Sequence, residues 1–87
     1  MLDEFVDWMV GKYGYGYFKN SHELSSSVVV DFESDDVIGR FTVWDDFSSM
    51  SEVIDVKTGE FRVNERIESS SLDELERVFV RFVSFLN

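Results

Sequence analysis

The sequence predicts one α+β domain, built as a four-stranded antiparallel meander with an N-terminal and a C-terminal helix on one face. Apolar residues recur at helical spacing at both ends of the chain, and four segments between them are rich in β-branched and aromatic residues. Only a few turn-forming residues separate these segments, and such short connections join antiparallel neighbours. The length of 87 residues fits a single domain over residues 1–87.

The first predicted element is a helix with an apolar stripe made by Leu2, Phe5, Val6, Met9 and Val10. Gly11 or Gly14 is expected to end it, because glycine adopts the left-handed conformation of a helix C-terminus without strain. The next stretch alternates tyrosine with glycine over residues 13–18 and is rich in serine over residues 20–27. This composition predicts a loop or an irregular segment.

Four strands are then predicted over residues 28–32, 37–44, 50–56 and 61–67. Ser34-Asp35-Asp36 is a tight turn, and Lys57-Thr58-Gly59-Glu60 is a short hairpin turn with Gly59 at the position of positive φ. In a meander these two turns lie at one end of the sheet. The tyrosine-rich loop, Asp45-Asp46-Phe47 and Ser69-Ser70 are expected at the other end.

The closing helix is predicted most directly. Ser71-Leu72-Asp73-Glu74 is a capping box, in which the serine hydroxyl accepts a helix amide and the glutamate reaches back. The apolar stripe that follows consists of Leu72, Leu75, Val78, Phe79, Phe82, Val83 and Leu86. Neither helix can bury its stripe alone, so both are expected to cover the same face of the sheet.

Alternate strand residues point to opposite faces of a sheet. The covered face is expected to carry the more apolar set: Val28, Val30, Phe32, Phe41, Val43, Ile54, Val56, Phe61, Val63 and Ile67. The open face is then expected to carry a mixed set: Val29, Asp31, Arg40, Thr42, Trp44, Val53, Asp55, Arg62, Asn64 and Arg66. Such a mixture suits either a solvated face or a face that binds a partner.

The charge of the chain narrows the possible partners. Acidic residues outnumber basic residues 18 to 8, for a formal net charge of -10, and residues 1–56 hold 12 of the acidic and 3 of the basic residues. A field of one sign attracts cationic partners and repels nucleic acid and anionic membranes. Because 16% of the residues are aromatic, the chain is not a disordered acidic tail. A folded acidic module that binds a protein is the expected class.

The candidate partner-binding residues combine aromatic and charged side chains. Tyr15, Tyr17, Trp44, Asp45 and Asp46 are expected to gather at one rim of the sheet, where rigid rings and carboxylates make a plausible set of binding hot spots. The charged residues of the open face complete the candidate set: Arg40, Asp55 and Arg62.

Two enzymatic alternatives are weaker. Asp45 and Asp46 with Glu52 offer carboxylates to a hard cation, but the regular ligand spacing of a calcium loop is absent, so a solvated turn is favoured. His22 has serines nearby, but no Gly-x-Ser-x-Gly elbow is present, so a surface histidine is favoured. We therefore predict no catalytic residue, no metal site and no cofactor.

The chain contains no cysteine, which excludes disulfides and thiolate metal sites. No apolar run approaches the length of a transmembrane helix, and Met1–Glu4 does not begin a secretory signal. These features predict a cytoplasmic protein.

Three stretches resemble small immunity proteins of bacterial polymorphic toxin systems, and the TriTu immunity family in particular. They are residues 37–44 (VIGRFTVW), residues 52–60 (EVIDVKTGE) and the helix that begins Leu-Asp-Glu-Leu at residue 72. The resemblance implies an inhibitor without enzymatic activity that neutralises a cognate Rhs-type toxin. It further implies that this toxin is an ADP-ribosyltransferase acting on elongation factor Tu.

This implied function agrees with the charge, because a transferase pocket that binds the NAD pyrophosphate needs cationic groups that carboxylates can meet. The expected complex is one-to-one, with the open sheet face and the rim covering the toxin's active site. Three alternatives remain open: an immunity protein whose acidic residues mimic phosphate against a nuclease toxin, another kind of acidic interaction module, and a homo-oligomer that pairs through the open face.

Overall fold

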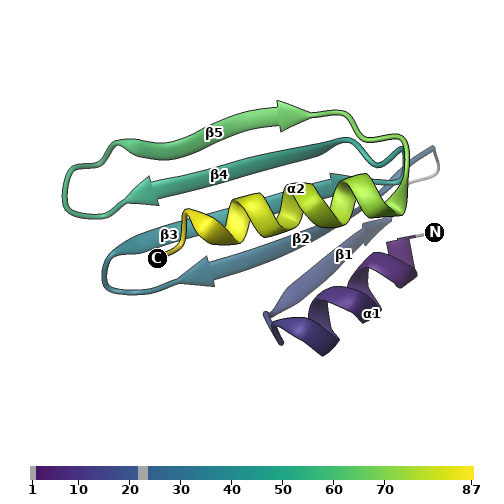
Figure 1. The fold of residues 1–87 in the computed structure, drawn as a ribbon, viewed down its shortest axis with the longest axis horizontal. Coiled ribbons are helices and arrows are strands. Elements are labelled where there is room, and N and C mark those ends of the chain that lie inside the picture. Colours follow the sequence, from purple (N-terminus) through teal and green to yellow (C-terminus); the bar gives the residue numbers. More distant parts are fainter. Residues whose placement is uncertain (1, 22–23) are drawn as a thin grey trace.

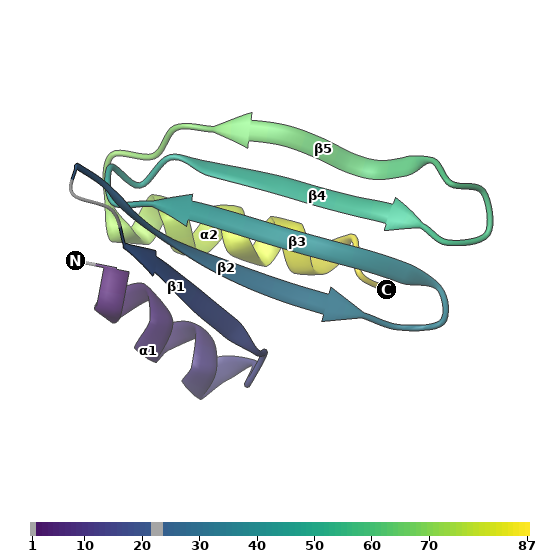
Figure 2. The ribbon, with the colours of Figure 1, turned by 180° about the vertical axis from the view of Figure 1, so that it is seen from behind.

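The fold is a five-stranded antiparallel sheet with two helices on one face, seen in a computed structural model that describes residues 2–21 and 24–87 (Figures 1 and 2). The strands follow the order of the sequence across the sheet. The elements are α1 (Leu2–Lys12), β1 (Tyr17–Ser21), β2 (Ser26–Glu33), β3 (Val37–Trp44), β4 (Ser49–Asp55), β5 (Phe61–Ile67) and α2 (Leu72–Ser84). His22 lies outside the described residues.

The α+β class, the antiparallel meander and the four predicted strands are confirmed, but the predicted strand number is wrong by one. The additional strand is β1, which falls in the tyrosine- and serine-rich stretch predicted to be irregular. It pairs with β2 from Tyr17 opposite Val30 to Ser21 opposite Ser26. All five of its residues are exposed, so it has no burial alternation that a sequence pattern could reveal. Backbone pairing at the sheet edge defines this strand instead.

Both helices cover the same face, as predicted. Phe5 of α1 and Phe79 of α2 are fully buried with their ring centroids 5.4 Å apart, and the Phe41 ring of β3 lies 5.0 Å from that of Phe79. The core therefore joins both helices to the centre of the sheet.

The helix ends follow from local chemistry. Gly14 has a φ of 70° and its amide donates to the Met9 carbonyl, which closes the C-terminus of α1. At the start of α2 the Ser71 hydroxyl accepts from the Glu74 amide, as the capping box predicts. The Glu74 carboxylate reaches back to the Ser70 amide, and this hydrogen bond lowers the pKa of Glu74.

The predicted faces of β4 are wrong. Val53 is fully buried under the helices, whereas Ile54 lies on the open face opposite Ile38. Two buried serines, Ser49 and Ser51, precede Val53 on the covered face, so a hydrophobicity pattern points to the wrong alternation.

The predicted faces of β5 are wrong at its first two residues. A register shift between Val53 and Ile54 pairs Phe61 with Ile54, which leaves Phe61 exposed on the open face. Arg62 turns toward the end of α2 on the covered side instead. Val63 is on the covered face, as predicted.

Candidate interaction face

The face opposite the helices is an ordered grid of side chains, because paired residues of neighbouring strands share a face. Figure 2 views the sheet from this side. We call Ile38, Ile54 and Phe61 the apolar row, since they are successive partners across β3, β4 and β5. The neighbouring polar row consists of Asp31, Arg40, Glu52 and Asn64. The next row runs through Phe18, Val29, Thr42, Met50 and Arg66, and Trp44 lies beyond it opposite Ser27.

Trp44, Asp45 and Asp46 lie together where β3 turns into β4, as predicted; we call this the Trp44 end. The Arg66 guanidinium lies 5.1 Å from the centroid of the Trp44 ring, a cation–π contact that covers part of the indole. Asp45 accepts a 3.0 Å hydrogen bond from the Ser26 amide. Asp46 accepts from the hydroxyl and the amide of Ser48, and these hydrogen bonds lower its pKa.

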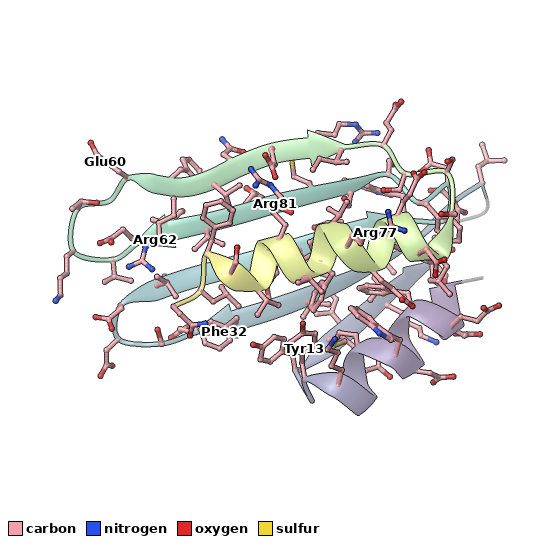
Figure 3. All side chains as sticks on the ribbon, viewed as in Figure 1. Tyr13, Phe32, Glu60, Arg62, Arg77 and Arg81 are labelled. Atoms are coloured by element: carbon pink, nitrogen blue, oxygen red, sulfur yellow. The ribbon has the colours of Figure 1, made fainter. Side chains whose placement is uncertain are left out.

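Tyr15 and Tyr17 do not join Trp44, contrary to the prediction. The extra strand β1 runs antiparallel to β2 and begins beside Val30, so its first residue lies well away from the end that holds Trp44. The Tyr15 ring stacks on Tyr13 at 5.5 Å and meets Phe32 at 5.5 Å. Figure 3 shows Tyr13 and Phe32 beside α2, on the covered side of the sheet. Burial raises the pKa of Tyr15, so this tyrosine seals the core edge.

Arg40 is on the open face, as predicted. Its Nε donates to the Asp31 carboxylate at 2.9 Å, and Glu52 is its partner across β3 and β4. A hollow of about 220 Å³ opens here, lined by Asp31, Ile38, Arg40, Glu52 and Ile54. It therefore has charged side chains, the Arg40 guanidinium between two carboxylates, on one side and aliphatic side chains on the other.

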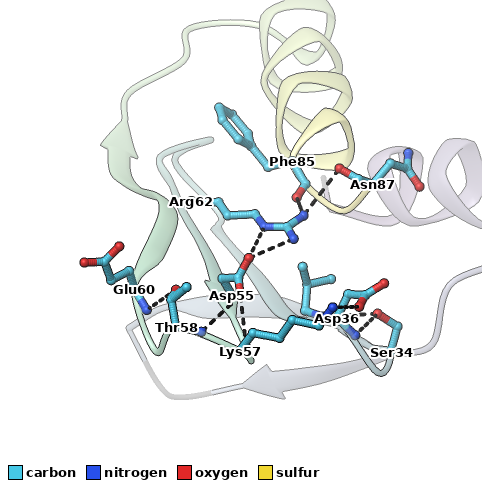
Figure 4. A network of polar contacts seen from close by, with 10 residues as sticks. Ser34, Asp36, Asp55, Lys57, Thr58, Glu60, Arg62, Phe85 and Asn87 are labelled. Atoms are coloured by element: carbon cyan, nitrogen blue, oxygen red, sulfur yellow. Dashed lines mark hydrogen bonds and ion pairs between the residues drawn. The ribbon is translucent and has the colours of Figure 1, made fainter.

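Asp55 and Arg62, also candidate contacts, are joined within the fold on the covered side (Figure 4). Arg62 donates to Asp55 at 3.0 Å and to the carbonyls of Phe85 and Asn87 beyond the end of α2. Hydrogen bonds from Arg62 and from the Thr58 and Lys57 amides lower the pKa of Asp55. The pair thus ties the β4–β5 hairpin to the C-terminus of α2.

The two hairpin turns at the other end of the sheet lie side by side; we call this the hairpin-tip end. The Val56 amide donates to the Asp36 carbonyl at 2.9 Å, and Lys57 lies 3.9 Å from the Asp36 carboxylate. Figure 3 shows Glu60 projecting from this end. Large apolar side chains are exposed here by nearly half of their surface: Ile38, Val56 and Phe61. Phe61 is on the open face because of the register shift between β4 and β5, which the sequence pattern missed.

The carboxylates considered as cation ligands do not come together as a metal centre in the described part of the chain. This part contains no group of three or more His, Cys, Asp or Glu side chains that could hold a metal ion. Asp45 and Asp46 serve a turn, and Glu52 lies in the middle of β4. None of the described helices is long and apolar enough to span a membrane.

Comparison with known proteins assigns the family. None of the curated proteins matches the chain significantly. The family model described as "Immunity protein TriTu" matches residues 3–85, which is nearly the whole chain and includes all five strands, α2 and all but the first residue of α1. The function implied by this family is toxin immunity through binding of a cognate toxin protein. The chain belongs to the TriTu immunity protein family.

Proposed function

We propose that this protein is a non-enzymatic inhibitor that binds its cognate toxin domain in a one-to-one complex. In this proposal the open sheet face covers the active-site cleft of the toxin. The observation that carries it is the family match over residues 3–85, combined with a rigid sheet that has helices on one face only. A sheet backed by a close-packed core offers a pre-organised surface, which reduces the entropic cost of association.

We propose that the toxin is an ADP-ribosyltransferase that modifies elongation factor Tu, and that inhibition takes place in the cytoplasm. The net charge of -10 supports this class of target. A pocket that binds the NAD pyrophosphate must present cationic groups or amide donors, and a strongly acidic protein is attracted to such a pocket at long range. The same charge would accelerate the encounter between the two proteins.

Of the residues predicted to contact the partner, Arg40 and Trp44 have the most suitable positions, because both lie on the open face. Asp45 and Asp46 lie next to Trp44 and remain predicted contacts. Tyr15, Tyr17, Asp55 and Arg62 remain untested as contacts, although the structure gives Tyr15, Asp55 and Arg62 internal roles.

The test is a titration of this protein against its cognate toxin domain, with NAD-dependent labelling of elongation factor Tu as the readout. We expect labelling to stop at one equivalent, and calorimetry to give a stoichiometry of one. A second arm adds the protein after labelling is complete. Removal of the label at that stage would contradict the proposal, because it would mean that the protein is a hydrolase and not an inhibitor.

The rival target class is a nuclease, against which carboxylates would mimic nucleic-acid phosphates. A parallel assay for DNA and RNA cleavage by the same toxin domain separates the two classes. Cleavage that this protein suppresses, without any consumption of NAD, would replace the transferase by a nuclease and leave the inhibitor role intact.

A further inference from the structure

The hairpin-tip end of the open face has the composition of a docking site. Ile38 and Phe61 are each 49% exposed, and Ile54 lies between them in register across three neighbouring strands. Single exposed apolar residues are ordinary on a protein surface, whereas a contiguous group rimmed by polar residues marks an interaction site. Val56, 47% exposed, lies at the tip of the hairpin that joins two of these strands.

This surface is held rigidly. The Val56 amide bonds to the Asp36 carbonyl and joins the two hairpin tips, and the Ser34 hydroxyl accepts from two amides of its own turn. Arg62 ties the β4–β5 hairpin to α2 through Asp55 (Figure 4). Side chains that project from such a braced frame lose little conformational freedom when a partner covers them, which favours hot spots.

The charge around the apolar row indicates the chemistry of the partner. Glu33, Asp35 and Glu60 surround this end, and the described residues give none of their carboxylates an ion-pair partner. Within the hollow beside the row, Arg40 is paired with Asp31, and Glu52, its cross-strand neighbour, has no ion pair among those residues. Two copies of this chain meeting at the face would bring the acidic tips together, which disfavours a self-paired dimer.

We propose that the hairpin-tip end is the principal docking site for the toxin domain. The apolar row packs against an apolar patch of the toxin. The adjacent hollow receives a lysine or arginine side chain, with its aliphatic stem over Ile38 and Ile54 and its charged head toward Glu52. This inference depends on the proposed inhibitor function and names the part of the face that carries it.

The experiment measures binding of the cognate toxin domain to single variants by calorimetry and surface plasmon resonance. Ile38→Ser and Phe61→Ser are expected to weaken binding by at least about tenfold each. Glu52→Gln is expected to weaken it by about tenfold, with a smaller dependence of the association rate on salt. The matched controls are Val10→Ser and Val80→Ser, both 43% exposed on the helices, and Glu4→Gln on α1. They should change affinity by less than about twofold, on the scale of an uninvolved surface position.

The possible outcomes separate this inference from the proposed function. Wild-type protein that binds while Ile38→Ser and Phe61→Ser bind equally well would overturn the docking site and leave the inhibitor role standing. Wild-type protein that does not bind the toxin would remove both. A homodimer that Phe61→Ser dissolves would assign the face to self-association and would also overturn the inference.

Hydrogen exchange of the wild-type complex provides a readout that needs no variant. We expect the largest protection on binding at the amides of Ile38 and of residues 56–60, and smaller protection over residues 45–49. Protection confined to residues 45–49 would place the interface at the Trp44 end and would count against the hairpin-tip site.

Discussion

At the Trp44 end of the open face, the indole ring lies under the Arg66 guanidinium and both aspartates accept hydrogen bonds from nearby amides. At the hairpin-tip end, Ile38 and Phe61 are half exposed, and the carboxylates of Glu33, Asp35 and Glu60 have no ion pairs among the described residues. Both ends combine apolar and acidic side chains. The difference teaches that a side chain is available to a partner only where the fold has not already engaged it in a hydrogen bond, an ion pair or a packing contact.

At the hairpin-tip end, the covered side and the open face of the sheet also differ in the kind of side chain they carry. There the fold uses charged residues internally, in the Asp55–Arg62 pair, and exposes large apolar residues. Burying apolar surface on binding contributes about 25 cal/mol per Å². Leaving these residues outside lowers the stability of the free protein, and a partner recovers that stabilisation on binding.

The largest expected effect comes from neighbouring β4 residues on opposite faces. Val53→Ala should lower the free energy of unfolding by about 2–3 kcal/mol, because it removes buried methyl groups and leaves a cavity. Ile54→Ala, at a partly buried position on the open face, should lower the free energy of unfolding by about 1 kcal/mol or less. Urea unfolding of both variants measures the difference, and the reverse order would restore the alternation that the hydrophobicity pattern suggested.

Gly39→Ala should lower the free energy of unfolding by about 2 kcal/mol. A Cβ atom at Gly39 would lie 2.7 Å from Leu86 Cδ2 and 3.2 Å from Phe82 Cζ, so these two buried side chains would have to move. Gly11→Ala is the control, because the same change in α1 meets nothing within 4 Å. It should raise stability by about 0.5–1 kcal/mol. Equal effects at the two glycines in thermal unfolding would contradict this close helix–sheet approach.

The aromatic residues at the two ends should also differ in how much they stabilise the free protein. Trp44→Ala should cost about 1–2 kcal/mol of stability, since the ring is partly buried and packs with Arg66. Phe61→Ala should cost less than about 1 kcal/mol, because nearly half of its surface is exposed. Chemical unfolding of both variants tests this. A larger loss of stability for Phe61→Ala than for Trp44→Ala would show that Phe61 stabilises the fold, and would contradict the contrast between the two ends.

The smallest expected effect concerns pH. The pKa of Asp55 is lowered from its ordinary value of 3.8 by Arg62 and the nearby amides, so its contribution is complete above about pH 4. That contribution is lost as the pH falls through the lower folded-state pKa. Asp55→Asn should therefore lower Tm at pH 7, and the gap from wild type should close below pH 3.8. Asp35→Asn controls for net charge, and a gap that is independent of pH would exclude the carboxylate as its cause.

Local sequence signals predicted a structural feature correctly wherever all the interacting residues lie in one short segment. The Ser71–Glu74 box capped α2, Gly59 adopted a φ of 73°, and the apolar stripe of α2 became part of the core. The strand bounds of residues 37–44 and 61–67 were also predicted correctly. In each case the interacting groups lie within one turn, one hairpin or one helical repeat.

The candidate face could be predicted only in part. Arg40 and Trp44 were placed on the correct face because β3 alternates cleanly between buried and exposed residues. Asp55 was assigned to the wrong side because the buried serines of β4 hide its alternation, and Arg62 because the register shift at the end of β4 cannot be derived from either strand alone. Tyr15 and Tyr17 were placed at the wrong end because the pairing of β1 leaves no mark in its composition.

By itself, the sequence determined the fold class, the two amphipathic helices, the turn positions, the strong negative charge and the resemblance to an immunity family. Only the tertiary structure decided which face each residue of β4 and β5 occupies and which carboxylates are already bonded. The physical reason is that strand register decides which sheet face a side chain occupies and which groups it can bond. Register joins residues far apart in the chain, such as Ile38, Ile54 and Phe61. Composition and periodicity report only what each segment contributes by itself.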